Sequence, residues 1–355
     1  MSSPTGRSRD LRTRIASTDV ARLAGVSQKT VSRVMNDEPY VREEVRERVL
    51  LAARQLRYRP NWAARSLTSG RTRRIGVVAL GTQLYGPTIT LVAIERSARL
   101  MGYSFSIAYT TEDHEHGIAD ALDTLLEQGV DGIVLSEAID EGPVPFTLDI
   151  PVLTIGRFPG LDAACRVRSD EKSDRSGYVA TKHLIELGHR EIRHLAGPSR
   201  WRAARDRADG WRGAMAEAGL DAVEPVAGDW SCDSGYKAGL TLARDGAMTA
   251  VFSANDDMAI GLIRALHDSG LRVPDDVSVI GMDDIPAARF LNPALTTIAQ
   301  DFTAIAAKGV RLLVDQINAP SATEHLLDEA PRPLIVREST AALSSQLRRE
   351  RPESR

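Results

Sequence analysis

The sequence predicts an α/β protein: a small helical domain at the N-terminus, followed by a two-lobed core of doubly wound parallel sheets. Between residues 17 and 59, apolar residues recur at helical spacing and are interrupted by a turn. Between residues 71 and 341, short aliphatic segments alternate with helical patterns, as they do in parallel sheets. These units are too many for one compact sheet, so we expect two lobes.

Charge is distributed unevenly along the 355 residues. Residues 1–74 contain 17 Lys and Arg against 7 Asp and Glu, a net charge of +10, whereas the remainder contains 28 against 41, or −13. The positive part is where a polyanion such as DNA would bind. Residues 1–16 are polar and Arg-rich and should form a flexible basic arm, which either touches phosphates or only aids solubility.

Targeting signals are not apparent. Residues 1–16 lack the apolar centre of a signal peptide, and no apolar run approaches the roughly 20 residues that span a bilayer. The two cysteines, Cys165 and Cys232, match no metal-binding spacing and indicate reduced thiols. We therefore expect a soluble cytoplasmic protein with no membrane partner, no cofactor and no metal site.

Residues 19–36 (DVARLAGVSQKTVSRVMN) have the pattern of a helix, a tight turn and a second helix. Gly25 interrupts the first apolar stripe, and Ser27 stands where a side-chain oxygen can cap the second helix. In that helix Val31 and Val34 point one way, while the opposite face is polar and basic. Such a face suits the major groove of DNA, because amides and guanidinium groups pair with base edges. A solvated amphipathic helix pair is the alternative.

Residues 41–58 predict a third helix able to cover the first two, and the sequence YRPNWAARSL follows at residues 58–67. Residues 19–67 resemble the DNA-binding headpiece of the lac repressor (LacI/GalR) family of bacterial transcription regulators, in which VS..TVSRV.N precedes a third helix and Y.PN..A..L. Residues 15–18 depart from the family, which has a Thr and an aliphatic residue there, and this leaves the cap of the first helix open. The DNA contacts that the resemblance implies are Gln28, Lys29, Thr30, Ser32, Arg33, Asn36, Asn61, Ala64 and Leu67.

Residues 60–70 are too short for a helix that is stable alone in water, although Asn61 can cap one running to Leu67. The resemblance makes this segment the family's hinge helix. It implies that two copies order on DNA and wedge Leu67 into the minor groove, which opens a base step and bends the duplex. The alternative is that Leu67 anchors a linker to the core.

The core from residue 71 to 341 has predicted strands at 75–80, 104–109, 132–136, 152–155, 192–195, 250–253 and 277–280. Predicted helices include 88–101, 118–128, 175–187, 207–218, 235–244 and 258–269, with Gly at many of their ends. Stretches such as HLIELGHREIRHLAGP, FSANDDMAIGLIRAL and LTTIAQDF resemble the effector-binding core of the same family, itself similar to periplasmic sugar-binding proteins. The resemblance implies three crossings between the lobes and a small molecule in the cleft.

Polar residues just after strands are the ligand candidates, because open parallel sheets bind ligands beyond the carboxyl ends of their strands. By this rule, and at positions matching the family's ligand contacts, the candidates are Arg207, Trp230, Asn255, Asp283 and Gln300. Carboxylate, amide, guanidinium and indole groups suit the hydroxyls and the apolar face of a sugar. Solvated loop positions or helix caps are the alternative readings.

In the first lobe the resemblance implies that Leu84, Tyr85 and Pro87 touch the ligand and transmit closure. Where some family members place a sugar-binding Asp after the fourth strand, this chain has Gly156 and Arg157, so Arg157 is a candidate with a different specificity. His114-Glu115-His116 is a metal-site fragment by composition alone and is better read as a solvated loop. No Ser-His-Asp order, phosphate loop or G-x-G-x-x-G run appears, so no enzymatic activity is expected.

The sequence thus predicts a transcriptional repressor that binds a near-palindromic operator as a homodimer and responds to a mono- or disaccharide. A nucleobase or nucleoside corepressor is the nearest alternative, and two aromatic rings around a planar ligand would favour it. A solute-binding protein or an enzyme is the more distant one. Residues 342–355 form a polar tail without the Leu heptads of a tetramerising coiled coil.

Overall fold

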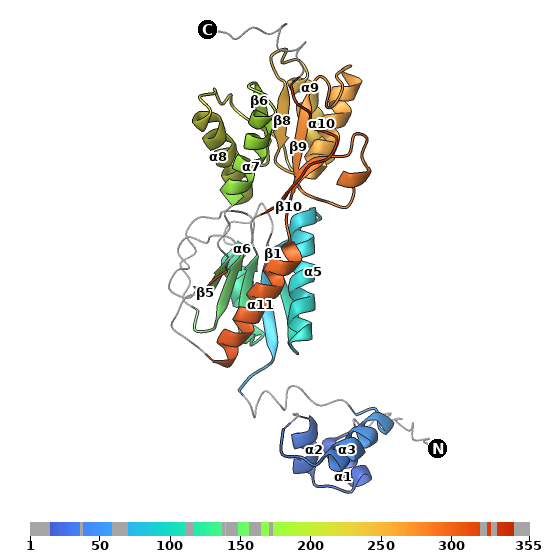
Figure 1. The fold of residues 1–355 in the computed structure, drawn as a ribbon. Helices are drawn as coiled ribbons and strands as arrows, with labels where there is room; N and C mark the ends of the chain where they lie inside the picture. The colour runs from blue at the N-terminus through green and yellow to red at the C-terminus, as the bar shows by residue number, and fades with distance from the viewer. Residues whose placement is uncertain are drawn as a thin grey trace, which may run out of the picture. The chain divides into compact units, whose positions relative to one another are not determined.

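The computed structural model describes residues 15–35, 38–58, 70–110, 117–136, 139, 148–155, 165–169, 173–319, 325–327 and 332–343. The chain divides into two compact units, Met1–Thr72 and Arg73–Arg355. The first unit contains three described helices, and the second contains two sheets with helices on their faces (Figure 1).

The headpiece consists of α1 (Ser17–Ala24), α2 (Gln28–Met35) and α3 (Glu43–Gln55), as predicted. Their apolar stripes meet in one core made of Val20, Ala21, Ala24, Val31, Val34, Val49, Ala52 and Ala53. Gly25 ends α1 with a φ of 66°, a left-handed conformation that glycine adopts without steric cost. The Ser27 hydroxyl accepts a hydrogen bond from Thr30 N at 3.1 Å, which confirms the predicted cap of α2.

The N-cap of α1 is a feature of the headpiece that the sequence did not predict. The N-cap residue is Ala16, whose side chain has no oxygen to offer to the helix. The Asp19 carboxylate instead accepts a hydrogen bond from Ala16 N at 3.0 Å. An acidic group in the first turn also faces the positive end of the helix dipole, which offsets part of the missing cap.

The second unit has strands β1 (Arg74–Leu80), β2 (Ser104–Thr110), β3 (Gly132–Ser136), β4 (Val152–Ile155), β5 (Cys165–Ser169), β6 (Ile192–Ala196), β7 (Val226–Ala227), β8 (Ala250–Ser253), β9 (Ser278–Asp283), β10 (Thr296–Ala299), β11 (His325–Leu327) and β12 (Leu334–Ile335). Its helices are α5 (Tyr85–Leu100), α6 (Gly117–Glu127), α7 (Ser173–Glu186), α8 (Arg202–Glu217), α9 (Cys232–Leu242), α10 (Asp256–Asp268) and α11 (Phe302–Asn318), with a 3-10 turn η1 (Ala288–Phe290).

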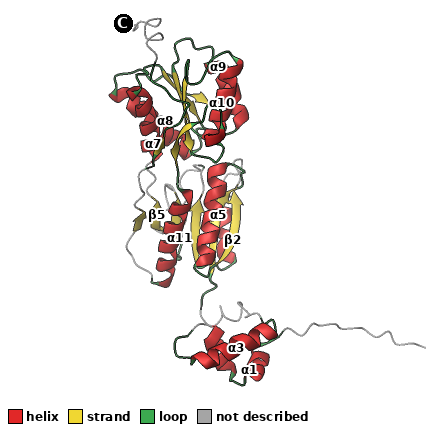
Figure 2. Cartoon of the chain, turned by 45° about the vertical axis from the view of Figure 1, so that its right-hand side comes forward, coloured by secondary structure: helices red, strands yellow, loops and turns green. Residues whose placement is uncertain are grey.

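Each lobe is a sheet covered by helices on both faces (Figure 2). The first lobe has the strand order β11-β5-β4-β3-β1-β2, and all of its pairings are parallel. Helices α5 and α11 pack against one face and α6 against the other, giving two apolar clusters. Both faces are therefore buried, which explains why β1 is an almost continuous apolar run.

The second lobe has the order β12-β10-β9-β8-β6-β7, parallel except for β12. Helices α9 and α10 cover one face, and α7 and α8 cover the other. The chain passes into this lobe after β5, returns to the first lobe between β10 and α11, and crosses again between β11 and β12. This confirms the three expected crossings.

Predicted and observed elements agree closely for β3, β4 and β8, and the helices differ mainly at their starts. Helix α8 begins at Arg202 and not at residue 207, because the residues RAARD contain no helix breaker. Strands β5, β7, β11 and β12 were not predicted, since they are short and lack a long apolar run. The glycines expected at helix ends, among them Gly102, Gly129 and Gly270, do adopt positive φ.

None of the described helices combines the length and apolar character needed to cross a bilayer.

Replacement of either of two glycines by alanine should change the free energy of unfolding, in opposite directions. A Cβ at Gly261 in α10 would lie 1.9 Å from Cys232 O of α9, so Gly261→Ala must push the two helices apart. We expect it to lower the free energy of unfolding by about 1–3 kcal/mol.

Gly213 in α8 has no atom within 4 Å of its Cβ position. Gly213→Ala is the matched control and should raise the free energy of unfolding by about 0.4–1 kcal/mol, because it restricts the unfolded chain. Denaturant titration of both variants measures the difference. Equal effects of the two substitutions would contradict the close packing of α9 on α10.

Candidate functional sites

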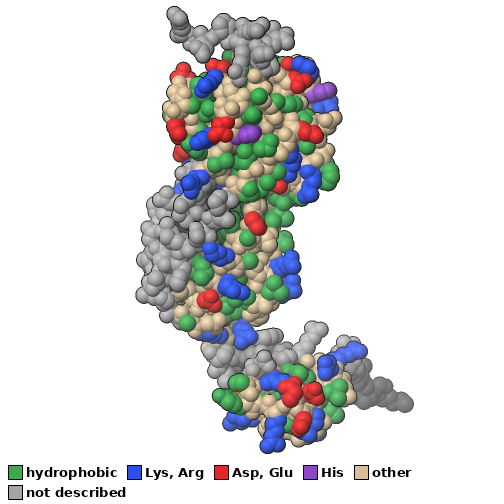
Figure 3. All heavy atoms as spheres, viewed as in Figure 1, with side chains coloured by type: hydrophobic (Ala, Val, Ile, Leu, Met, Phe, Trp, Pro, Cys, Tyr) green, Lys and Arg blue, Asp and Glu red, His purple; other side chains and the backbone are tan. Residues whose placement is uncertain are grey.

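The exposed face of α2 carries the predicted reading residues. Gln28, Lys29, Ser32 and Arg33 are exposed and Thr30 is half-buried, while Val31 and Val34 lie in the headpiece core. Burial of the valines fixes the rotation of the helix, so the polar side chains face outward together. In Figure 3 basic side chains are spread over the visible face of the headpiece, interrupted by one group of acidic side chains.

Gln28 and Arg33 are among the side chains of this face that already have polar partners. Gln28 Nε2 donates to Ser17 Oγ at 2.9 Å, which ties the start of α2 to α1. Arg33 Nε lies 3.4 Å from Glu38 Oε2, and both side chains are about half exposed. An exposed ion pair of this kind contributes at most about 1 kcal/mol, so Arg33 can leave it for a stronger charge-assisted contact. Asn36, Asn61, Ala64 and Leu67 lie outside the described residues.

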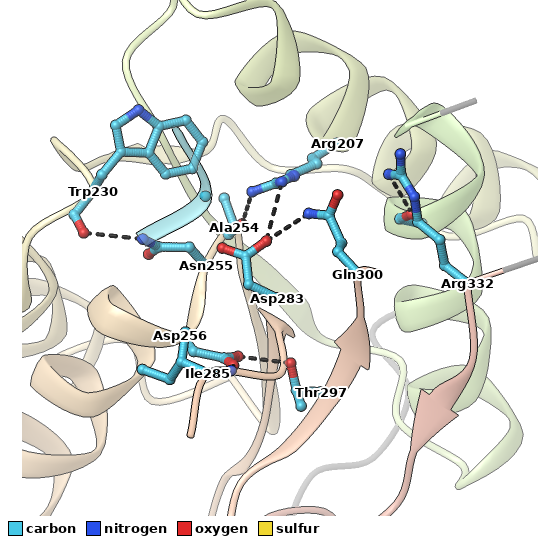
Figure 4. Close-up of polar contacts among 12 residues, drawn as sticks. Arg207, Trp230, Ala254, Asn255, Asp256, Asp283, Ile285, Thr297, Gln300 and Arg332 are labelled. Atoms are coloured by element: carbon cyan, nitrogen blue, oxygen red, sulfur yellow. Dashed lines mark hydrogen bonds and ion pairs between the residues drawn. The ribbon is translucent and has the colours of Figure 1, made fainter. Parts of the chain in front are cut away.

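The second polar site lies at the carboxyl ends of the second-lobe strands (Figure 4). Asp283 ends β9, Gln300 follows β10, and Arg207 reaches them from the second turn of α8. Arg207 Nη2 lies 3.4 Å from Asp283 Oδ1, and Gln300 Nε2 donates to the same oxygen at 2.5 Å. Arg207 Nη1 also donates to Ala254 O, just after β8. The structure thus brings these three predicted residues together.

Burial shapes the electrostatics of this group. The side chains of Arg207 and Asp283 are only 8% and 10% exposed. Burial raises the pKa of Asp283, although Arg207 and Gln300 pull it in the opposite direction. Within the described part of the chain, Asp283 Oδ2 and Gln300 Oε1 accept no hydrogen bond. The site therefore offers two acceptors beside a guanidinium donor.

Trp230 and Asn255 lie next to Arg207, Asp283 and Gln300, but each also contacts other parts of the protein. Asn255 Oδ1 caps α10 by accepting from Met258 N at 3.0 Å, and its Nδ2 donates to Trp230 O at 3.0 Å. The Trp230 indole is 4% exposed, and the Arg207 guanidinium lies 5.4 Å from its ring centre. The ring also occupies the space where a Cβ at Gly197 would be. A ligand reaches the indole face only if a neighbour moves.

Trp201 is a residue of this region that sequence reasoning missed. It precedes α8, its backbone forms an antiparallel bridge with Ile139 of the first lobe, and its ring meets Trp230 edge-on at 5.4 Å. Both tryptophans belong to an apolar cluster that also contains Leu80 from the end of β1. The predicted start of α8 was placed too late to draw attention to Trp201.

The first lobe contributes the start of α5. Leu84 and Tyr85 pack against the same cluster, and Pro87 is half-buried in the first turn of the helix. Burial raises the pKa of the Tyr85 hydroxyl, and Asp283, Asp284 and Asp256 of the second lobe add to the effect. Tyr85 therefore faces the carboxyl groups across the two lobes.

Other sequence candidates have simpler explanations. Asp275 and Asp276 pair with the exposed Arg272, and Asp284 pairs with Arg337 at 2.6 Å. Arg157 and His114-Glu115-His116 lie outside the described residues. Among the residues that are described, no group of three His, Cys, Asp or Glu side chains is arranged to hold a metal ion.

Comparison with known proteins decides the family. Residues 18–61 match the model of bacterial regulatory proteins of the lacI family, and residues 181–340 match a periplasmic binding protein-like domain. The chain is 35% identical over 331 residues to an HTH-type transcriptional repressor PurR of Pasteurella multocida, covering 90% of this chain and 97% of that protein. This chain belongs to the lacI family of bacterial regulatory proteins.

Further relatives support the same family assignment. The PurR repressor of Vibrio campbellii is 35% identical over 335 residues, covering 92% of this chain and 98% of that one. The lac repressor dimer bound to operator and the anti-inducer ONPF superposes with a TM-score of 0.78 at 30% identity, covering 92% and 99% of the two chains. The CelR–cellobiose complex gives a TM-score of 0.65 at 32% identity, covering 92% and 100%.

The family member described here is a DNA-binding transcriptional repressor with an effector-binding core, and it is not an enzyme. As in the rest of this family of repressors, its place of action is the cytoplasm.

Arg33 provides the test of the α2 face. Arg33→Ala should cost about 1–3 kcal/mol at an operator selected from random duplexes and should reduce discrimination between sequences, because a guanidinium reads base edges. Fluorescence anisotropy with the selected and scrambled duplexes measures both effects. Arg22→Ala on α1, which removes an equally charged and more exposed side chain, is the control. An equal loss for all sequences would make Arg33 a phosphate contact only.

Proposed function

We propose that the operator affinity of this repressor is controlled by a mono- or disaccharide held between the two lobes by Arg207, Asp283 and Gln300. The observation that carries the proposal is the pair of acceptors without a hydrogen bond in the described residues, Asp283 Oδ2 and Gln300 Oε1, next to the Arg207 guanidinium. Neighbouring sugar hydroxyls both donate and accept hydrogen bonds, so one ring can engage acceptors and guanidinium together.

Desolvation makes this arrangement selective. A buried acceptor that meets an apolar group loses its hydrogen bonds to water without replacement, which costs about 1–3 kcal/mol. The side chains of Asp283 and Arg207 are nearly excluded from solvent, so a ligand that reaches them must itself supply the hydrogen-bond partners that water cannot. Trp230 supports a sugar ring in this proposal only after Arg207 or Trp201 shifts from its ring. Asn255 acts by holding the Trp230 backbone.

We further propose that the repressor works as a homodimer on a two-fold operator. One recognition helix per chain requires two copies to read two half-sites. The first lobe has an apolar surface at its edge strand β2 and at α5, where Val92, Leu100 and Tyr109 are 58%, 75% and 58% exposed. Apolar residues on an uncovered edge are typical of an interface. The solved structure of a lac repressor dimer on its operator agrees with this.

The proposed control follows from linkage. A sugar that favours one arrangement of the lobes shifts the dimer toward that arrangement, and operator affinity changes by the differential binding energy. The headpiece contacts proposed are those of the α2 face, together with Asn36, Asn61, Ala64, Leu67 and the hinge segment. Leu84, Tyr85, Pro87 and Arg157 are the proposed contributions of the first lobe.

A nucleobase corepressor is the second candidate. The PurR relatives favour it, and so do the aromatic rings of Tyr85, Trp201 and Trp230 around one region. A planar base would stack on an indole and meet Asp283 with a ring N–H. We prefer sugars because both indoles are buried against protein groups, whereas Asp283 Oδ2 and Gln300 Oε1 offer two acceptors beside the Arg207 guanidinium.

Calorimetry on site variants tests the proposal. Arg207→Ala and Asp283→Asn should each weaken sugar binding by about 1–3 kcal/mol or more, because the partner left behind is a buried polar group without its bond. Operator binding should remain. The panel contains mono- and disaccharides, cellobiose among them, and nucleobases and nucleosides.

Arg212→Ala is the control, since it removes an exposed arginine from the same helix. Sugar affinity retained within about threefold in both site variants, less than one net hydrogen bond, would place the effector elsewhere. Binding of a nucleobase and not of any sugar would favour the second candidate.

A further inference from the structure

Three carboxyl groups converge beneath the proposed site, but only two have a cationic partner. Asp283 pairs with Arg207, and Asp284 pairs with Arg337. Asp256 at the start of α10 is fully buried, and none of its contacts in the described residues is with a cation. A buried carboxylate without a cation is costly, so this position needs an explanation.

The contacts of Asp256 join β10 to the chain just after β9 (Figure 4). Its Oδ1 lies 2.6 Å from the Thr297 hydroxyl of β10, and its Oδ2 accepts from Ile285 N at 2.9 Å. The carboxyl group also occupies the space beside Gly281 of β9, where a Cβ would lie 2.2 Å from Oδ1. Only glycine leaves room for the carboxyl group at that position.

The electrostatic balance favours the neutral carboxyl. The start of a helix stabilises an anion, but by less than complete burial destabilises it. Burial, together with the negative charge of Asp283, raises the pKa of Asp256 well above its usual range. The hydrogen bonds from Thr297 and Ile285 act in the opposite direction and are weaker than these two causes combined.

A neutral carboxyl also satisfies the geometry. Oδ2 must accept, because Ile285 N–H can only donate. Oδ1 accepts from the Thr297 hydroxyl when the carboxyl is charged, and a hydroxyl oxygen can equally accept a hydrogen bond from a protonated Oδ1. A proton on Oδ1 therefore keeps both contacts and removes the uncompensated charge.

We propose that Asp256 is a positioning residue that stays protonated at neutral pH, donates to Thr297 Oγ1, accepts from Ile285 N–H, and thereby sets Asp283 and Gln300 for the effector. The role in effector binding rests on the proposed function; the protonation does not. Thr297 lies three residues before Gln300. Asp283 and Asp284 have φ of 113° and 53°, unfavourable for non-glycine residues. Asp256 holds the chain just after them through Ile285 N, and its Oδ1 lies beside Gly281 just before them.

The charged and titratable groups that face this carboxyl come from every neighbouring element. Asp283 and Asp284 at the end of β9 raise its pKa, and Tyr85 of α5 interacts with its charge. Asp257 is its neighbour on α10, and Arg207 of α8 and Arg337 after β12 belong to the ion pairs of Asp283 and Asp284. The two arginines are paired to other carboxyl groups, so the net effect at Asp256 is repulsive for an anion.

Asp256→Asn tests the protonation in the full chain without ligand. Asn copies the neutral acid, because Oδ1 can accept from Ile285 N–H and Nδ2 can donate to Thr297 Oγ1. When the folded state raises the pKa of an acid, the free energy of unfolding of the protein falls as the pH rises from the unfolded pKa of that acid, about 3.9, toward the folded value. The Asn variant has no such loss, so its melting temperature should exceed that of wild type by an amount that grows as the pH rises above the unfolded pKa.

Asp233→Asn is the matched control. Asp233 is an exposed carboxylate in the first turn of α9, so its replacement should give no advantage that grows with pH. If Asp256→Asn instead melts below wild type by an amount that grows with pH, Asp256 works as an anion and the protonation is wrong. This readout needs no effector and is independent of which ligand binds.

The positioning role has a second readout, the pH profile of effector affinity for whichever panel compound binds wild type. Wild-type affinity should fall as the pH rises through the folded pKa of Asp256, whereas Asp256→Asn should stay within about threefold of its neutral-pH value. Asp256→Ala should bind at least about tenfold more weakly at every pH, since it keeps neither contact. Identical profiles for wild type and Asp256→Asn would overturn the positioning role. A wild type that binds no panel compound refutes the proposed function alone.

Discussion

The contact between Arg207 and Asp283 organises the effector lobe. It joins α8 to the end of β9, and Gln300 extends it to the point where the chain returns to the first lobe. Both charged groups are almost completely buried, so their attraction is offset by loss of hydration. Such a pair contributes little net stability. Its value lies in holding donors and acceptors at defined positions where water is excluded.

The surroundings of this pair follow from that constraint. Asp284 is paired with Arg337. Asp256 lies nearby, buried between Thr297 of β10 and Gly281 of β9. Gly281 leaves the space for it, and the left-handed backbone at Asp283 turns the carboxylate toward Arg207. Strain at consecutive non-glycine residues persists only when neighbouring contacts maintain it, and here those contacts come from α10 and β10.

The same region connects the lobes. Ile139 of the first lobe pairs with Trp201, whose ring contacts Trp230, which in turn lies against the Arg207 guanidinium. At the other end, Gln300 is followed by Asp301, the cap of α11 in the first lobe. A ligand that rearranges the Arg207–Asp283 contact therefore acts on two separate connections to the first lobe, which is the physical requirement for coupling a cleft to a change in lobe arrangement.

The sequence alone determined the headpiece helices, the alternating strands and helices of the core, and the strand ends at which Asp283 and Gln300 lie; Arg207, predicted by the same rule, lies instead in the second turn of α8. These follow from local periodicity, turn chemistry and the rule for parallel sheets, all of which act over short stretches. Only the tertiary structure decided that Asn255 is a helix cap, an alternative that the sequence left open. It also revealed that Trp230 is covered by Arg207, that Trp201 adjoins Trp230, and that Asp256 lies beside Thr297. Those facts depend on which side chains from distant segments share one desolvated space, and no local pattern in the chain specifies that.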